Sequence, residues 1–226
     1  MKARLLAPVL TAVLLGVGAL PAAAHGGPGD DDGAQGGTAY AASPFLAPQH
    51  SRFTLAILLP VPDNHVSGAG TATVQLNSDD TARITVNASG LLDGAPHAMH
   101  IHIKGSGECP TADAATLHNG YRAISTTDGL PAYGPIGTSL TTKGDTSPAS
   151  ALAVDRFPAT GTFHYSRTIQ LTSDVAQQVR ADNAVVVVHG IDYNHNGRYD
   201  GVLGPSDLNP ALPQEATAPA LCGPLD

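Results

Sequence analysis

Two histidines spaced two residues apart are the clearest chemical feature of this 226-residue sequence. They are His100 and His102, which alternate with three apolar residues in Met99-His100-Ile101-His102-Ile103. In a β-strand, successive side chains point to opposite faces, so both imidazoles share one polar face and the apolar residues share the buried face. Two imidazoles on a rigid strand can bind one metal ion with little ordering cost. The alternative is a polar strand face that merely carries exposed histidines, so further ligands must decide between them.

Two more histidines fall where such ligands are expected. His118 lies within a stretch of 46 residues, Gly105 to Ser150, that has no convincing long element, and a loop of that length is usually functional or disordered. His189 ends the apolar segment Ala184 to His189. Four imidazoles without a thiolate suit Cu(II), so His100, His102, His118 and His189 are predicted to bind copper. By contrast, His164 falls on the polar side of its own strand and is taken as merely exposed.

The elements that must position these residues are mostly short strands. The expected strands are Arg52 to Leu59, Gly70 to Leu76, Ala82 to Ala88, Pro96 to Lys104, Thr162 to Leu171 and Ala184 to His189, with weaker candidates at Arg122 to Thr126 and Gly137 to Thr142. One helix is expected over Ser173 to Ala181, capped by Thr172 or Ser173. From Gly190 to Cys222 the chain is expected to be loop. Many strands without βα alternation predict an all-β sandwich or barrel.

The N-terminal part predicts export. Residues 1–24 have two basic residues, an apolar run and Ala22-Ala23-Ala24, the pattern of a secretory signal, and a membrane anchor is the weaker alternative. Residues 25–49 are expected to be a flexible lead-in and residues 50–226 the β domain. No later stretch is apolar enough to span a bilayer, so the mature protein is expected outside the cytoplasm, secreted or periplasmic.

The net charge limits the classes of binding partner, and the cysteine content bears on disulfide formation. The formal net charge of −8, with Lys and Arg totalling 11, argues against nucleic acid as a partner. Cys109 and Cys222 are the only cysteines. In an exported chain they are expected to form one disulfide.

Together these motifs resemble copper–zinc superoxide dismutase, and more closely the secreted bacterial superoxide-dismutase-like proteins. The family signature Gly-x-His-x-x-His-x-His lies across Ala95-Pro96-His97-Ala98-Met99-His100-Ile101-His102, with Ala95 at the Gly position. The resemblance implies that His100, His102, His118 and His189 are copper ligands, with His118 in the place of the bridging histidine. It implies that His97 bonds to the backbone and binds no metal. It also implies a Greek-key β-sandwich or barrel, a Cys109–Cys222 disulfide and superoxide as the substrate.

The sequence departs from the family at the zinc site and at the substrate channel. Pro135 replaces a zinc-binding aspartate and Ala132 a zinc-binding histidine, so zinc is not expected, as in copper-only members. His118 would then keep its second ring nitrogen free to take a proton, which makes it the expected catalytic residue. Pro219 stands where the family carries its substrate-guiding arginine, and without that charge superoxide should be attracted more weakly. Arg122 and Arg198 are candidates to replace it.

A second cation site is predicted directly after His189. Oxygen-bearing side chains alternate before Gly197 and continue to an aspartate, as at the start of a calcium loop. The candidate ligands are Asp192, Asn194, Asn196 and Asp200. The twelfth position holds Leu203 rather than a bidentate acid, so this is not a complete EF-hand. A hydrogen-bonded turn rich in Asp and Asn is the alternative, and the loop could also position His189.

Two functions from different classes remain open. One is a secreted copper-dependent dismutase that converts superoxide to oxygen and hydrogen peroxide. The other is a non-catalytic dismutase-like or chordin-type extracellular β-sandwich that binds metal or a partner. The four histidines favour the first, while Pro219 and the missing zinc ligands favour the second.

Overall fold

The computed structural model describes residues 50–226, so the expected signal peptide and lead-in lie outside the described residues. Residues 50–226 contain three α-helices, α1 (Thr126–Tyr133), α2 (Ser173–Arg180) and α3 (Gln214–Thr217). The strands are β1 (Arg52–Pro60), β2 (Ala69–Leu76), β3 (Thr81–Ser89), β4 (Met99–Ile103), β5 (Thr116–His118), β6 (Tyr121–Ala123), β7 (Ile136–Ser139), β8 (Phe163–Gln170), β9 (Ala184–His189) and β10 (Pro219–Pro224). In the described part of the chain, no helix combines the length and the apolar character needed to cross a bilayer.

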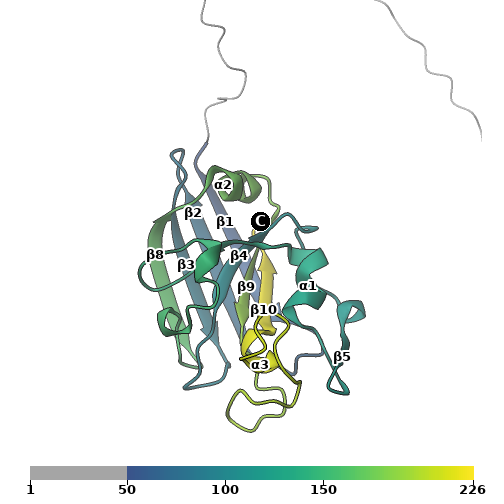
Figure 1. Ribbon diagram of the computed structural model, residues 1–226. Helices are drawn as coiled ribbons and strands as arrows, with labels where there is room; N and C mark the ends of the chain where they lie inside the picture. The colour runs from purple at the N-terminus through teal and green to yellow at the C-terminus, as the bar shows by residue number, and fades with distance from the viewer. Residues whose placement is uncertain (1–49) are drawn as a thin grey trace, which may run out of the picture. The chain divides into compact units, whose positions relative to one another are not determined.

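Eight of the strands form one curled antiparallel sheet in the order β7-β4-β9-β10-β1-β2-β3-β8, with β5 and β6 paired separately (Figure 1). β1 is the corner of this sheet. It pairs with β2 from Arg52 to Leu58, but with β10 only at Leu59 and Pro60. The predicted all-β class is confirmed, and the finer superoxide-dismutase-like type stays a prediction.

The core lies between the two halves of the curled sheet. In β3 the even-numbered residues Ala82 to Ala88 are buried, while Arg83 and Asn87 point outward, which matches the alternation of the sequence. The main core cluster joins these residues to Met99 and to apolar residues of β9 and β10. Burial of both inner faces therefore holds the β4–β9 pair, which carries the histidines, in a fixed register.

β4 departs from the sequence expectation at its second face. All five residues from Met99 to Ile103 are buried, so the histidine face is not solvated as a polar strand face would be. α1 and the loop between β7 and β8 cover it: Tyr133 stacks edge-on against His102, with ring centroids 4.6 Å apart, and Phe157 lies 5.8 Å from His100. The two imidazoles are therefore core groups.

Several elements were not expected from the sequence. The loop prediction for Gly190 to Cys222 is wrong, because this stretch contains α3 and most of β10. β10 pairs with β9 although Pro219, Gly223 and Pro224 weaken its local strand signal. α1 forms inside the long loop because Ser125 caps it: the Ser125 side chain accepts the Asp128 N–H while the Asp128 carboxylate accepts the Ser125 N–H.

The predicted disulfide is confirmed. Cys109 and Cys222 are bonded, and 113 positions separate them in the chain. The bond ties the start of the long loop to β10, which lies next to β9 in the sheet.

Candidate metal centre

Three of the predicted copper ligands come together in the structure. His100 and His102 project from β4, and His189 ends the neighbouring strand β9. One nitrogen of each ring lies within 4.8 Å of the others, and the side chains are buried, with exposed fractions of 3%, 0% and 2%. Strand pairing brings the three rings together because β4 and β9 are adjacent and antiparallel.

Each of these rings is oriented by a backbone carbonyl. The contacts are His102 Nδ1 with Gly134 O at 2.8 Å, His189 Nδ1 with Thr217 O at 2.7 Å, and His100 Nε2 with Ala151 O at 3.2 Å. A carbonyl oxygen only accepts hydrogen bonds, so each of these nitrogens carries the proton. The remaining nitrogens then carry lone pairs: His100 Nδ1, His102 Nε2 and His189 Nε2. None of the three has a hydrogen-bond partner among residues 50–226.

The carbonyl that orients His102 depends on a glycine. Gly134 has φ +80°, in the left-handed region that glycine tolerates best. A Cβ at this position would lie 2.1 Å from Ile103 O and 2.3 Å from Gly105 N. Gly134 therefore lets the chain after α1 approach β4 closely enough for its carbonyl to reach His102.

Burial keeps the three imidazoles neutral at ordinary pH. Desolvation, together with the neighbouring His189, lowers the pKa of His102 to about 3. Desolvation likewise lowers the pKa of His189 to about 4, against the opposing effects of its bond to Thr217 and of the nearby Asp207 carboxylate. The pKa of His100 is also well below its usual value, because of burial and of the two other rings. Neutral imidazoles with free lone pairs are the form that binds metal ions.

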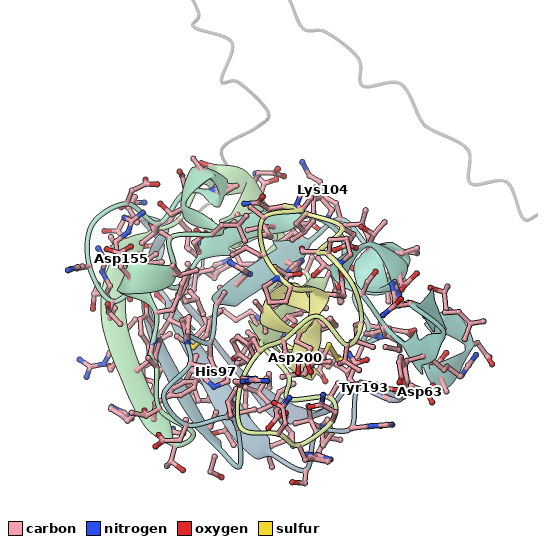
Figure 2. All side chains as sticks on the ribbon, turned by 60° about the horizontal axis from the view of Figure 1, so that its bottom comes forward. Asp63, His97, Lys104, Asp155, Tyr193 and Asp200 are labelled. Atoms are coloured by element: carbon pink, nitrogen blue, oxygen red, sulfur yellow. A yellow bond between two sulfur atoms is a disulfide. The ribbon has the colours of Figure 1, made fainter. Side chains whose placement is uncertain are left out.

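His97 lies outside this group and bonds to the backbone, as predicted. Its Nε2 is 2.8 Å from Leu92 O, and its Nδ1 is 3.0 Å from the carbonyl oxygen of His189 itself. The Tyr199 hydroxyl approaches the same Nδ1 at 3.2 Å. Figure 2 shows His97 beside the loop that carries Asp200. His97 and Tyr199 therefore link that loop to the end of β9.

The structure does not bring His118 into the three-histidine group. His118 lies in β5, and its Nε2 is 2.7 Å from Asp128 Oδ2 and 3.0 Å from Thr116 Oγ1. In Figure 1 the β5 hairpin lies beyond α1, away from β4 and β9. Three of the four predicted ligands are thus assembled, and copper ligation by His118 stays a prediction.

The predicted calcium loop has its oxygens engaged in internal hydrogen bonds. The Asp192 carboxylate accepts the N–H groups of Asn196 at 2.9 Å and Gly197 at 2.8 Å, and the side-chain amides of Asn194 and Asn196 donate to Asp200. This arrangement matches the Asp- and Asn-rich turn. Calcium binding stays a prediction.

Sequence reasoning missed an acid that supports this loop. Glu215, in α3, is fully buried, and its carboxylate accepts the N–H of Tyr193 at 2.8 Å and also that of Asp200. Burial raises the pKa of Glu215, an effect that these two N–H donors partly offset. The acid lies 15 positions after Asp200, and nothing in the local sequence marks it as buried.

No protein-family model matches this chain, and a search of curated proteins finds no significant match. The functional argument therefore rests on the geometry of the site and on the motifs of the sequence.

Proposed function

We propose that this protein is a secreted superoxide-dismutase-like protein that holds one copper ion through His100, His102 and His189. In this proposal it dismutates superoxide to oxygen and hydrogen peroxide without a zinc site. His118 is proposed as the fourth copper ligand and as the residue that takes up a proton.

The observation that carries the proposal is a group of three adjacent histidine rings, each with one nitrogen that has no partner among residues 50–226. A buried polar atom without a partner is costly, and native proteins rarely leave one unexplained. Here three lie together in one site, on rings whose other nitrogens are all engaged. A ligand that accepts three lone pairs at once is a metal cation. Copper is the metal proposed because imidazole ligands suit it and because Pro135 and Ala132 stand where the resembled family has zinc ligands.

The residues of this chain would do three things for the ion. The three histidines would bind it, and the carbonyls of Gly134, Ala151 and Thr217 would fix the direction of each ring, which strengthens metal binding. Tyr133 and Phe157 would exclude water from the histidine face. Copper, when bound, would supply the exchange of single electrons that dismutation requires.

The first experiment is copper titration of protein purified without metal. We expect one copper per chain, lost in His102→Ala. The matched control is His164→Ala, because His164 is exposed on the outer face of β8, where its Nδ1 lies 2.7 Å from Asn87 Oδ1. This control should keep both the copper stoichiometry and the dismutase rate. A chain that takes up no copper, or that retains one zinc ion at these histidines instead, would contradict the proposal.

A second candidate function is a metal-binding β-sandwich without useful turnover. The contact between His118 and Asp128 favours it, because this bond occupies the nitrogen that a copper ligand or proton carrier would need. His118→Ala separates the two candidates. If His118 acts in dismutation, this variant binds copper more weakly and loses activity. Copper-loaded protein with no dismutation above the free-copper background would instead support the non-catalytic candidate.

A further inference from the structure

One cavity leads from the surface to the histidine group. The buried side chains of His100 and His189 line it, and so do Leu152 and Leu208, which are 36% and 44% exposed to solvent. Its volume is about 20 Å³, which is room for one or two water-sized molecules. We call Leu152 and Leu208, with Ile136 and Ala151 beside them, the apolar mouth.

The lining of this cavity carries no charge. Of the nine described residues around it, none is Lys, Arg, Asp or Glu. The one hydroxyl among them, on Thr217, is 2.6 Å from Ser206 Oγ and so is already engaged. An anion entering here would lose water without gaining a partner from the walls.

A carboxylate near His189 also disfavours an anion. The Asp207 carboxylate, next to Leu208 in sequence, is close enough to His189 to raise its pKa electrostatically. Arg122, considered above as a replacement for a guiding arginine, is 3.4 Å from Asp63 Oδ2 and 3.2 Å from Ala115 O and does not line the cavity. The whole chain carries a formal charge of −8. Negative charge near a cleft lowers the local concentration of anions.

From these observations we propose that the apolar mouth selects small uncharged molecules, of the dioxygen and peroxide type, and hinders anions. This inference rests on the proposed metal site and defines what reaches it. Superoxide would then be a slow substrate that meets no attracting charge on the walls of the cavity, whereas the uncharged products oxygen and hydrogen peroxide would leave freely. Organic substrates are too large for the cavity.

The test uses two probes of copper-loaded protein that do not depend on turnover. Azide is a small anion whose binding to oxidised copper is followed by absorption, and carbon monoxide is a small neutral ligand whose binding to reduced copper is followed by infrared spectroscopy. Both are titrated in sodium perchlorate from about 0.01 M to about 0.1 M, which shortens the Debye length from about 30 Å to about 10 Å. The bound copper ion itself attracts azide, so we expect azide affinity to fall with salt, and to fall more steeply in a variant that adds a cation at the mouth, while carbon monoxide affinity stays constant.

Leu208→Lys places a cation at the mouth, and Leu208→Met is its uncharged control. For a charge on the order of 10 Å from the ion and an effective dielectric constant of about 20 to 40, Coulomb's law predicts azide binding about 4- to 15-fold tighter at low salt. Carbon monoxide binding should not change. Leu152→Lys repeats the test from the other side of the mouth should the first variant fail to fold.

The copper content of every sample separates the two proposals. With one copper per chain, an azide affinity whose salt dependence is the same with and without an added cation at the mouth overturns the inference while the proposed function stands. The same holds if both lysine variants leave azide binding unchanged, or if they alter carbon monoxide binding equally. A chain that binds no copper overturns both.

Discussion

The buried histidines should make the metal-free protein sensitive to mild acid. A histidine whose folded pKa is lowered takes up its proton more readily in the unfolded state. Its contribution to stability is therefore fully present above about pH 6.5 and is lost as the pH falls toward the folded pKa. For His189 and His102 that window extends down to about 4 and about 3. The change to test is thus a fall from pH 7 to pH 5 in the presence of a chelator.

The size of the effect follows from the two pKa values. Each pH unit within the window costs about 1.4 kcal/mol per histidine, so the 1.5 units between pH 6.5 and pH 5 cost about 2 kcal/mol each. Through His102 and His189 together, the fall to pH 5 should lower the unfolding free energy of the protein by about 4 kcal/mol. His100, whose pKa is lowered by the same burial, adds to this loss. A typical domain is stable by only about 5–15 kcal/mol, so the loss should be large.

Urea unfolding at several pH values measures this loss, and His189→Gln isolates one proton. Between pH 5 and pH 6.5 the slope of unfolding free energy against pH should be smaller in the variant by about 1.4 kcal/mol per unit. Carboxylates such as Glu215 titrate in both proteins, so the difference between the slopes removes their contribution. Equal slopes in the two proteins, or a stability that does not change from pH 7 to pH 5, would refute the reasoning.

Two further predictions concern the disulfide and the loop after β9. The Cys109–Cys222 bond closes a loop of 113 positions, so replacing both cysteines by serine should lower the unfolding free energy by about 4–5 kcal/mol in the chain-entropy model. A change below about 1 kcal/mol in urea unfolding would contradict that model here. Millimolar calcium should raise the thermal midpoint of the wild-type protein against a chelator control, but not that of Asp192→Asn. An unchanged wild-type midpoint would leave only the hydrogen-bonded turn.

The sequence alone predicts those strands and helices whose apolar side chains recur with a regular period. β3 was predicted as Ala82 to Ala88 and extends from Thr81 to Ser89, and α2 begins at Ser173 as expected, with the Thr172 hydroxyl accepting the Val175 N–H. β10 was missed because its prolines and Gly223 carry no local strand signal, and only pairing with β9 makes it a strand. α1 was missed because Gly129 and Pro131 interrupt its helical pattern.

In the candidate site, too, some parts could be predicted from the sequence and others could not. His100, His102 and His189 could be found because their residue type is chemically distinctive and their strands are regular. The carbonyls that orient them could not, because every residue has a carbonyl group and these three belong to loops and α3. Gly134 is 32 positions from His102 in the chain, Ala151 is 51 from His100, and Thr217 is 28 from His189. Such contacts follow from the tertiary packing alone.

The covering of the histidine face also explains why the site calls for a ligand. On an open strand face, water would satisfy each free imidazole nitrogen, and three histidines would need no further explanation. Here Tyr133 and Phe157 cover the histidine face, and each buried nitrogen left without a partner costs about 1–3 kcal/mol. Three of them cost about 3–9 kcal/mol, which is comparable with the whole stability of a typical domain. Because one cation can offset all three at once, their shared burial is a stronger argument for a metal than the number of histidines.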